Sequence, residues 1–180
     1  MYGISTSDRL HRLRFRATVL SLVVSLIAAS ATAQTPDNVA VIIGNQNYPS
    51  SVGKLEYAHR DGDAFRTFVV ENLGYKPSNI IDLRDASKSE LEKTFGTKEN
   101  LEADLWRYLD PRGGSKVVVF YSGLGASGPG DGKPYLLPVD ANPANVETDG
   151  YSLNQLFRNI SQLPISSVAV FFDASFSKAP

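Results

Sequence analysis

The 180-residue sequence contains no cysteine, and this absence excludes several kinds of chemistry at once. A thiolate nucleophile, a disulfide framework and a zinc site with thiolate ligands all require cysteine side chains. An excess of one charge sign is also missing, because 18 basic and 19 acidic residues leave a net charge of -1. Such a chain has no field that attracts nucleic acid or an anionic membrane surface, so we expect neither as a partner.

What is present is the composition of an ordinary globular protein. Hydrophobic residues make up 42% of the chain and charged residues 21%, which argues against a disordered or fibrous protein. The length predicts a single folded domain.

Residues 1–33 have the pattern of a cleavable signal peptide. Four arginines between residues 9 and 16 precede an apolar run at 17–29, and the small-x-small tripeptide at 31–33 is typical of a signal peptidase site. An uncleaved anchor is the alternative, but the run is shorter than the roughly 20 residues that span a bilayer. We therefore expect an exported protein, periplasmic or secreted, whose mature chain begins near Gln34 and is stabilised without disulfides.

From residue 38 onward, strand-like and helix-like segments alternate. Ser87 and Glu90 have the spacing of a capping box at a helix start. Strands are predicted at 38–43, 80–83, 116–121 and 167–172; helices at 58–73, 87–96, 101–109 and 152–160; and a Gly- and Pro-rich surface loop at 122–134. The alternation predicts an α/β fold, a mainly parallel sheet with helices on both faces. In such sheets, function gathers in the loops at the carboxyl ends of the strands.

Three sequence blocks in these loops resemble the caspase superfamily, in particular metacaspases. Residues 41–48 and 55–61 are similar to the metacaspase start, a strand ending in Gly-Asn-x-x-Tyr followed by Leu-x-x-Ala-x-x-Asp. Residues 121–125 and 131–140 resemble the Ser-Gly-His-Gly turn and the run that follows it, and residues 171–177 resemble the Asp-Ala-Cys-Phe-Ser turn. The blocks occur in family order with family-like spacing, so the resemblance implies a caspase-like three-layer sandwich over residues 38–180.

The resemblance also implies that both catalytic positions are substituted. Active members use a His in the first turn as general base and a Cys in the last turn as nucleophile. The chain has Leu124 at the His position and Ser175 at the Cys position. Leucine accepts no proton, and a serine hydroxyl without a base is a poor nucleophile, so we expect no cysteine-peptidase activity. Gly123 and Ser175 match positions whose backbone amides form the family's oxyanion hole.

Asp61 and Asp173 match the acidic positions that give metacaspases their preference for Arg or Lys. This predicts binding of basic peptide or protein segments through charge-assisted hydrogen bonds. For each carboxylate a purely structural role stays open: Asp61 as a favourable charge at a helix start, and Asp173 as a cap of the following turn.

Two further kinds of site have weaker signals. His59 is the one histidine beyond the predicted signal peptide, and it could serve as a base for Ser175 in a converted serine-type hydrolase of Arg or Lys substrates. Asp131 and nearby carboxylates could suggest calcium, which some metacaspases require, but their spacing is not that of a calcium loop. We expect no cofactor and no metal.

Relative to the family, the chain stops shortly after Ser175, so the small-subunit half is absent from this sequence. A last strand with an open edge would favour pairing with a second copy or with an active homologue. Three hypotheses follow: an inactive homologue that binds basic segments, a residual hydrolase, and a degenerate fragment without function.

Overall fold

The computed structural model describes residues 37–178 of the chain. The predicted signal peptide lies outside the described residues, so its cleavage and the export of the protein stay predictions. Within the described part, no helix is both long and apolar enough to cross a membrane.

The described chain contains six strands, five α-helices and two short 3-10 turns. Capping explains where one of the helices begins, because Ser87 and Glu90 form the predicted capping box at its start. In chain order the elements are β1 (Val39–Gly44), α2 (Ala58–Glu71), η1 (Pro77–Asn79), β2 (Ile80–Arg84), α3 (Lys88–Phe95), α4 (Asp104–Tyr108), β3 (Ser115–Ser127), β4 (Pro134–Leu136), η2 (Pro143–Asn145), α5 (Val146–Asp149), β5 (Tyr151–Ser152), α6 (Leu153–Ile160) and β6 (Ile165–Lys178).

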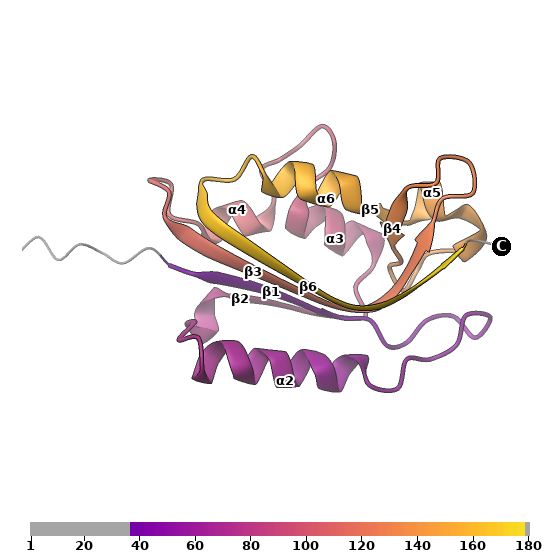
Figure 1. Ribbon diagram of the computed structural model, residues 1–180, viewed down its shortest axis with the longest axis horizontal. Helices are drawn as coiled ribbons and strands as arrows, with labels where there is room; N and C mark the ends of the chain where they lie inside the picture. Colours follow the sequence, from indigo (N-terminus) through magenta and orange to yellow (C-terminus); the bar gives the residue numbers. More distant parts are fainter. Residues whose placement is uncertain (1–36, 179–180) are drawn as a thin grey trace, which may run out of the picture. The chain divides into compact units, whose positions relative to one another are not determined.

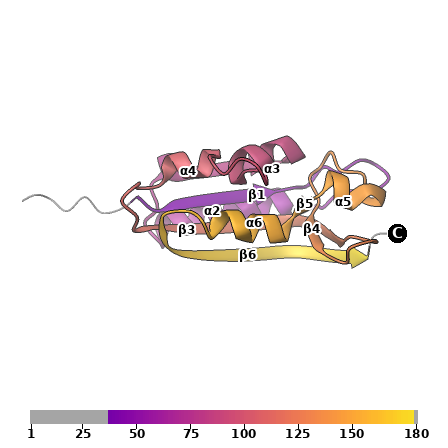
Figure 2. The same ribbon diagram turned by 90° about the horizontal axis from the view of Figure 1, so that it is seen from above.

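The strands form one mixed sheet in which the parallel part dominates. Strands β2, β1, β3 and β6 lie side by side and run parallel, while β4 and β5 continue from β3 in antiparallel pairs. β4 pairs with β3 from Gly125 onward, just beyond Ser122, where the pairing of β1 ends. Within residues 37–178, β6 pairs only with β3, and Figure 2 shows it along the outer edge of the sheet.

Helices cover both faces of this sheet, which confirms the predicted α/β three-layer sandwich. Helix α2 lies on one face, and α3, α4 and α6 lie on the other (Figure 1). The continuous apolar runs of β1 and β3 are buried because each faces a helical layer on both sides. The larger apolar cluster packs under α3, α4 and α6, and the smaller one packs under α2, where Phe65 stacks on Phe120.

Two predicted loops are strand in the structure. Residues 122–127, assigned to a surface loop, continue β3, and residues 173–178, assigned to the turn carrying Ser175, continue β6. The physical reason is mutual pairing, since β3 and β6 stay in parallel register as far as Ser127 and Lys178. The glycines of this segment also serve packing rather than a turn: a Cβ on Gly123 would lie 2.6 Å from Tyr121 Oη, and one on Gly125 would overlap the Phe176 ring.

The helix predicted at 101–109 is shorter than expected, because only Asp104–Tyr108 is helical. Side-chain hydrogen bonds satisfy the preceding backbone instead: Thr97 Oγ1 accepts from the amides of Glu99 and Asn100, and Asn100 Oδ1 accepts from that of Glu102. Such local bonds compete with helix formation.

Candidate functional site

The candidate site lies at the carboxyl ends of the parallel strands, where sequence reasoning placed it. The sheet register aligns Gly44 of β1 with Ser122 of β3, and Ser122 with Asp173 of β6. The described site residues therefore come from segments more than 100 positions apart that end at one edge of the sheet.

Leu124 and Ser175 occupy directly opposed positions on neighbouring strands. They are register partners in the parallel pairing of β3 with β6. Leu124 is half-buried and packs against a small apolar cluster that includes Tyr48 and Ala126, whereas Ser175 is exposed. The structure thus brings together the two positions that the family resemblance had paired, and it surrounds one of them with apolar side chains.

The backbone of Leu124 is held by two buried tyrosines. The amide of Leu124 donates to Tyr48 Oη over 2.9 Å, and its carbonyl accepts from Tyr121 Oη over 2.7 Å. Tyr48 Oη also donates to the carbonyl of Leu137 over 3.1 Å, and Tyr121 Oη lies 3.0 Å from the same carbonyl, so its single proton is shared between the carbonyls of Leu124 and Leu137. Burial raises the pKa of Tyr48, and it raises the pKa of the fully buried Tyr121 well above the ordinary value. Both phenols therefore stay neutral donors at physiological pH.

Gly123, the expected oxyanion position, is buried against the Tyr121 ring. Its register partner is Ala174, so Gly123 and Ser175 both belong to paired strands. A ligand that reaches these two residues therefore contacts paired strands rather than a turn.

The two carboxylates expected to bind basic side chains lie on the same face of the sheet. Ser122 Oγ donates to Asp61 Oδ2 over 3.4 Å, and Asp173 stands directly opposite Ser122 in the register, on the strand next to it. Side chains of register partners in a parallel pair point to the same face, here the face covered by α2. Asp61 is half-buried and Asp173 exposed, and within residues 37–178 neither forms an ion pair.

His59 lies beside Asp85, a contact that the sequence did not predict. Its Nε2 atom is buried and 3.1 Å from Asp85 Oδ1, without the alignment of a hydrogen bond. Asp85 follows β2, whereas Ser175 belongs to β6, and β1 and β3 lie between these strands. Three strand spacings of about 4.8 Å separate the two strands. The imidazole therefore lies at the β2 side of the sheet edge, and β1 and β3 lie between Asp85 and the strand of Ser175.

Asp85 organises the loop that follows β1. Its Oδ1 accepts from the amides of Gln46 and Asn47, each over 2.8 Å, and its Oδ2 accepts from Asn47 Nδ2. Burial alone would raise the pKa of Asp85, but the bonds from Asn47 and Gln46 outweigh it and hold the pKa below 3.8. Asp85 adopts a positive φ of 55°, which aspartate tolerates better than most residues.

Sequence reasoning missed these supporting residues. Asn45 and Tyr48 belong to a block that carried the family resemblance, and that block was the available signal, but no role followed from it. Asn45 is fully buried, accepts from the amide of Ala86 over 2.8 Å, and donates to the carbonyl of Leu137. It joins the segments after β1, β2 and β4, a function that depends on contacts between residues far apart in the chain.

Fold and site together define an α/β sandwich whose distinctive residues lie at the carboxyl edge of its parallel strands. The family model for the caspase domain matches residues 37–179, so the chain belongs to the caspase-domain family. A sequence comparison with curated proteins finds no match. Among the described residues, no group of three or more His, Asp or Glu side chains could hold a metal ion.

Proposed function

We propose that this caspase-family domain binds Arg- or Lys-containing polypeptide segments without cleaving them. The observation that carries the proposal is the position of Asp61 and Asp173 on either side of Ser122, on one face of the sheet. Two carboxylates without an internal cation leave their negative charge for a ligand. A guanidinium is planar and offers paired donors, so it suits two neighbouring carboxylates well.

The absence of cleavage follows from the side chains at the family's catalytic positions. Leu124 provides no base, and its apolar side chain packs beside Tyr48. Ser175 has a hydroxyl, but the imidazole of His59 lies 3.1 Å from Asp85 on another part of the sheet edge. A serine hydroxyl without a neighbouring base stays protonated and reacts slowly with a peptide carbonyl.

The test is fluorescence anisotropy with a labelled peptide that contains one arginine, alongside the same peptide with citrulline in its place. We expect the arginine peptide to bind more tightly, and to weaken as salt is added because exposed charges are screened. Asp61→Asn and Asp173→Asn should each weaken binding by about fivefold, the effect of one partly exposed charge pair.

Glu71→Gln is the matched control, because Glu71 is an exposed carboxylate at the opposite end of α2 and should leave affinity unchanged. Equal affinity for both peptides, or an equal loss in all three variants, would refute binding through this acidic pair. Mass spectrometry of the same samples tests the second half of the proposal. Cleavage after arginine that disappears in Ser175→Ala would show that the protein is a hydrolase.

A further inference from the structure

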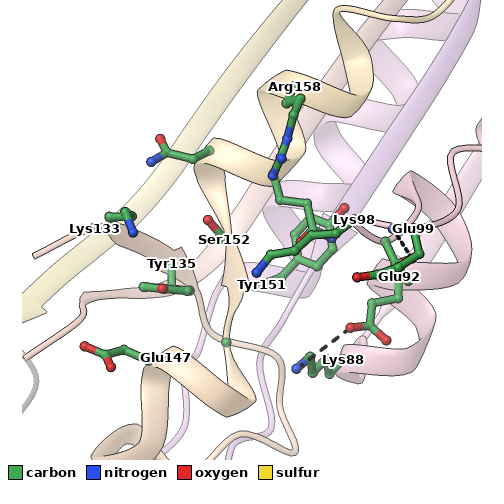
Figure 3. A pocket seen from close by; sticks show the side chains of 14 residues that line it. Lys88, Glu92, Lys98, Glu99, Lys133, Tyr135, Glu147, Tyr151, Ser152 and Arg158 are labelled. Carbon is green, nitrogen blue, oxygen red and sulfur yellow. Dashed lines mark hydrogen bonds and ion pairs between the residues drawn. The ribbon is translucent and has the colours of Figure 1, made fainter. Parts of the chain in front are cut away.

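A cleft lies on the other face of the sheet, away from Asp61 and Asp173. It has a volume of about 640 Å³ and is bounded by α3, the loop after α3, the β4 and β5 strands, and the first two turns of α6 (Figure 3). Its lining includes two buried side chains, Tyr151 and Gln155, which bond to the carbonyl of Gly96 and so are held in place. The cleft therefore has fixed walls that come from separate parts of the chain.

Four cationic side chains line this cleft, and two of them are already engaged. Lys88 donates to the carbonyl of Thr148 and lies 3.8 Å from Glu92, a pair drawn in Figure 3. Lys133 forms an ion pair with Asp131 over 3.1 Å. The remaining two, Lys98 and Arg158, form no ion pair with any residue in the range 37–178.

Two of the three carboxylates of the cleft are engaged by other groups. Glu92 faces Lys88, and Glu147 Oε1 accepts from the amides of Gly130 and Asp131. This leaves Glu99 as the one lining carboxylate with neither an ion pair nor an accepted hydrogen bond in the described part of the chain. Glu147 keeps its negative charge, but Figure 3 shows it on the side of Lys133 and Tyr135, away from Lys98 and Arg158, so Glu99 is the unpaired carboxylate on their side of the cleft.

The start of helix α6 provides further hydrogen-bond donors to the cleft. Helix α6 has no acidic residue in its first turn, and its N-cap residue Ser152 makes no side-chain cap bond. Ser152, Asn154 and Gln155 all line the cleft, so the positive end of the helix adds to the charge of Lys98 and Arg158. Figure 3 shows Arg158 entering from α6 and Lys98 from the loop after α3.

We propose that this cleft binds a small oxyanion, a carboxylate or phosphate group, between Lys98 and Arg158. The guanidinium supplies planar paired donors, and the ammonium adds a point charge from the opposite wall. This site is independent of the acidic pair, since the sheet separates the two, and its ligand has the opposite charge. The domain then offers two carboxylates without an ion pair on one face and a cleft with two such cations on the other.

The test is an NMR titration of ¹⁵N-labelled protein with sodium phosphate and, separately, with sodium succinate, at constant ionic strength. We expect saturable shifts of the amides of Lys98, Ser152, Asn154 and Gln155. Lys98→Gln and Arg158→Gln should each weaken binding by about fivefold. Glu99→Gln should tighten it by about twofold, because it removes a repulsive charge.

Lys116→Gln is the control, because Lys116 is an exposed lysine at the start of β3, outside the cleft. Asp61→Asn should also leave the titration unchanged, which separates this site from the proposed peptide site. Saturation by phosphate alone would assign the cleft to phosphate groups, and saturation by both would assign it to carboxylates as well. No saturable shift with either anion, or a loss as large in Lys116→Gln as in Arg158→Gln, would overturn the proposal.

Discussion

The two halves of β3 are stabilised by different interactions. Residues 115–121 lie in the apolar core, where Val117, Val119 and Tyr121 pack under α3, α4 and α6. Residues 122–127 contain two glycines. Leu124 and Ala126 pack in a smaller apolar cluster, and the hydroxyls of Tyr48 and Tyr121 form hydrogen bonds with the Leu124 backbone. Both halves pair with β6, but the first also pairs mainly with β1 and the second with β4, so the halves differ in strand partners as well as in side chains.

This difference indicates which part of such a sheet can accommodate a functional site. Apolar packing in the first half depends on volume and burial, and similar residues can substitute for one another. The hydrogen-bonded half depends on particular donor and acceptor atoms, because an unpaired buried group costs free energy. Leu124, which the resemblance matches to the family's His position, lies in this second half, and Ser175, matched to the Cys position, lies opposite it on β6.

The largest expected effect belongs to the apolar half. Leu156 of α6 is fully buried in the core cluster that packs against Val119. Leu156→Ala should lower the free energy of unfolding by about 3 kcal/mol, because it removes buried methyl groups and leaves a cavity. Urea denaturation measures this loss, and Leu73→Ala, at a leucine that is 46% exposed, is the control with a much smaller effect. Equal losses in the two variants would contradict this view of the core.

A smaller effect is expected at Asn45, whose backbone amide donates to the carbonyl of Ser122 at the start of the polar half. Asn45→Ala leaves the buried amide of Ala86 without its acceptor, so it should cost about 2 kcal/mol of unfolding free energy. Urea denaturation again provides the value, with the exposed Asn72→Ala as the matched control. Since Asn45 and Leu156 share no contact in these networks, the double variant should lose the sum of the two. A strongly non-additive double variant would mean that the halves are not independent.

The smallest expected effect is a loss of stability at acidic pH. The folded-state pKa of Asp85 is lowered below 3.8, so its bonds to Gln46 and Asn47 stabilise the fold above about pH 4, where the carboxyl is ionised in both states. This stability is lost as the pH falls through the folded-state pKa. Urea midpoints of wild type and Asp85→Asn should therefore converge between about pH 5 and pH 2. The exposed Glu71→Gln is the control, and a constant gap between wild type and Asp85→Asn across this range would refute the prediction.

Much of the fold could be predicted from the sequence because its signals are local. The buried run of β1, the strand β2, the capping box of α3 and the helix at α6 all follow from neighbouring residues, and the structure has them. The strand extensions to Ser127 and Lys178 could not be predicted, because each depends on a partner strand about 50 residues away. Glycines that would normally indicate a turn are here required by the rings of Tyr121 and Phe176.

The candidate site also contains residues that could be predicted from the sequence and residues that could not. Leu124, Ser175, Asp61 and Asp173 could be identified from motifs, since the motifs record which residue types follow which strands. Three other features could not be predicted from the sequence. They are the hydrogen bond from the Leu124 amide to Tyr48 Oη, the contact of His59 with Asp85, and the cleft lined by Lys98 and Arg158. Each of these joins side chains from elements with no pattern in common.

The sequence by itself determined the absence of thiol chemistry, the alternation of strands and helices, and the side chains at the family's catalytic positions. These are properties of composition and local order, which do not change with the environment of a residue. The tertiary structure alone decided that Asp61 and Asp173 share one face, that His59 turns to Asp85, and that two unengaged cations line one cleft. Distances and burial decide charge interactions, and they exist only once the chain has packed.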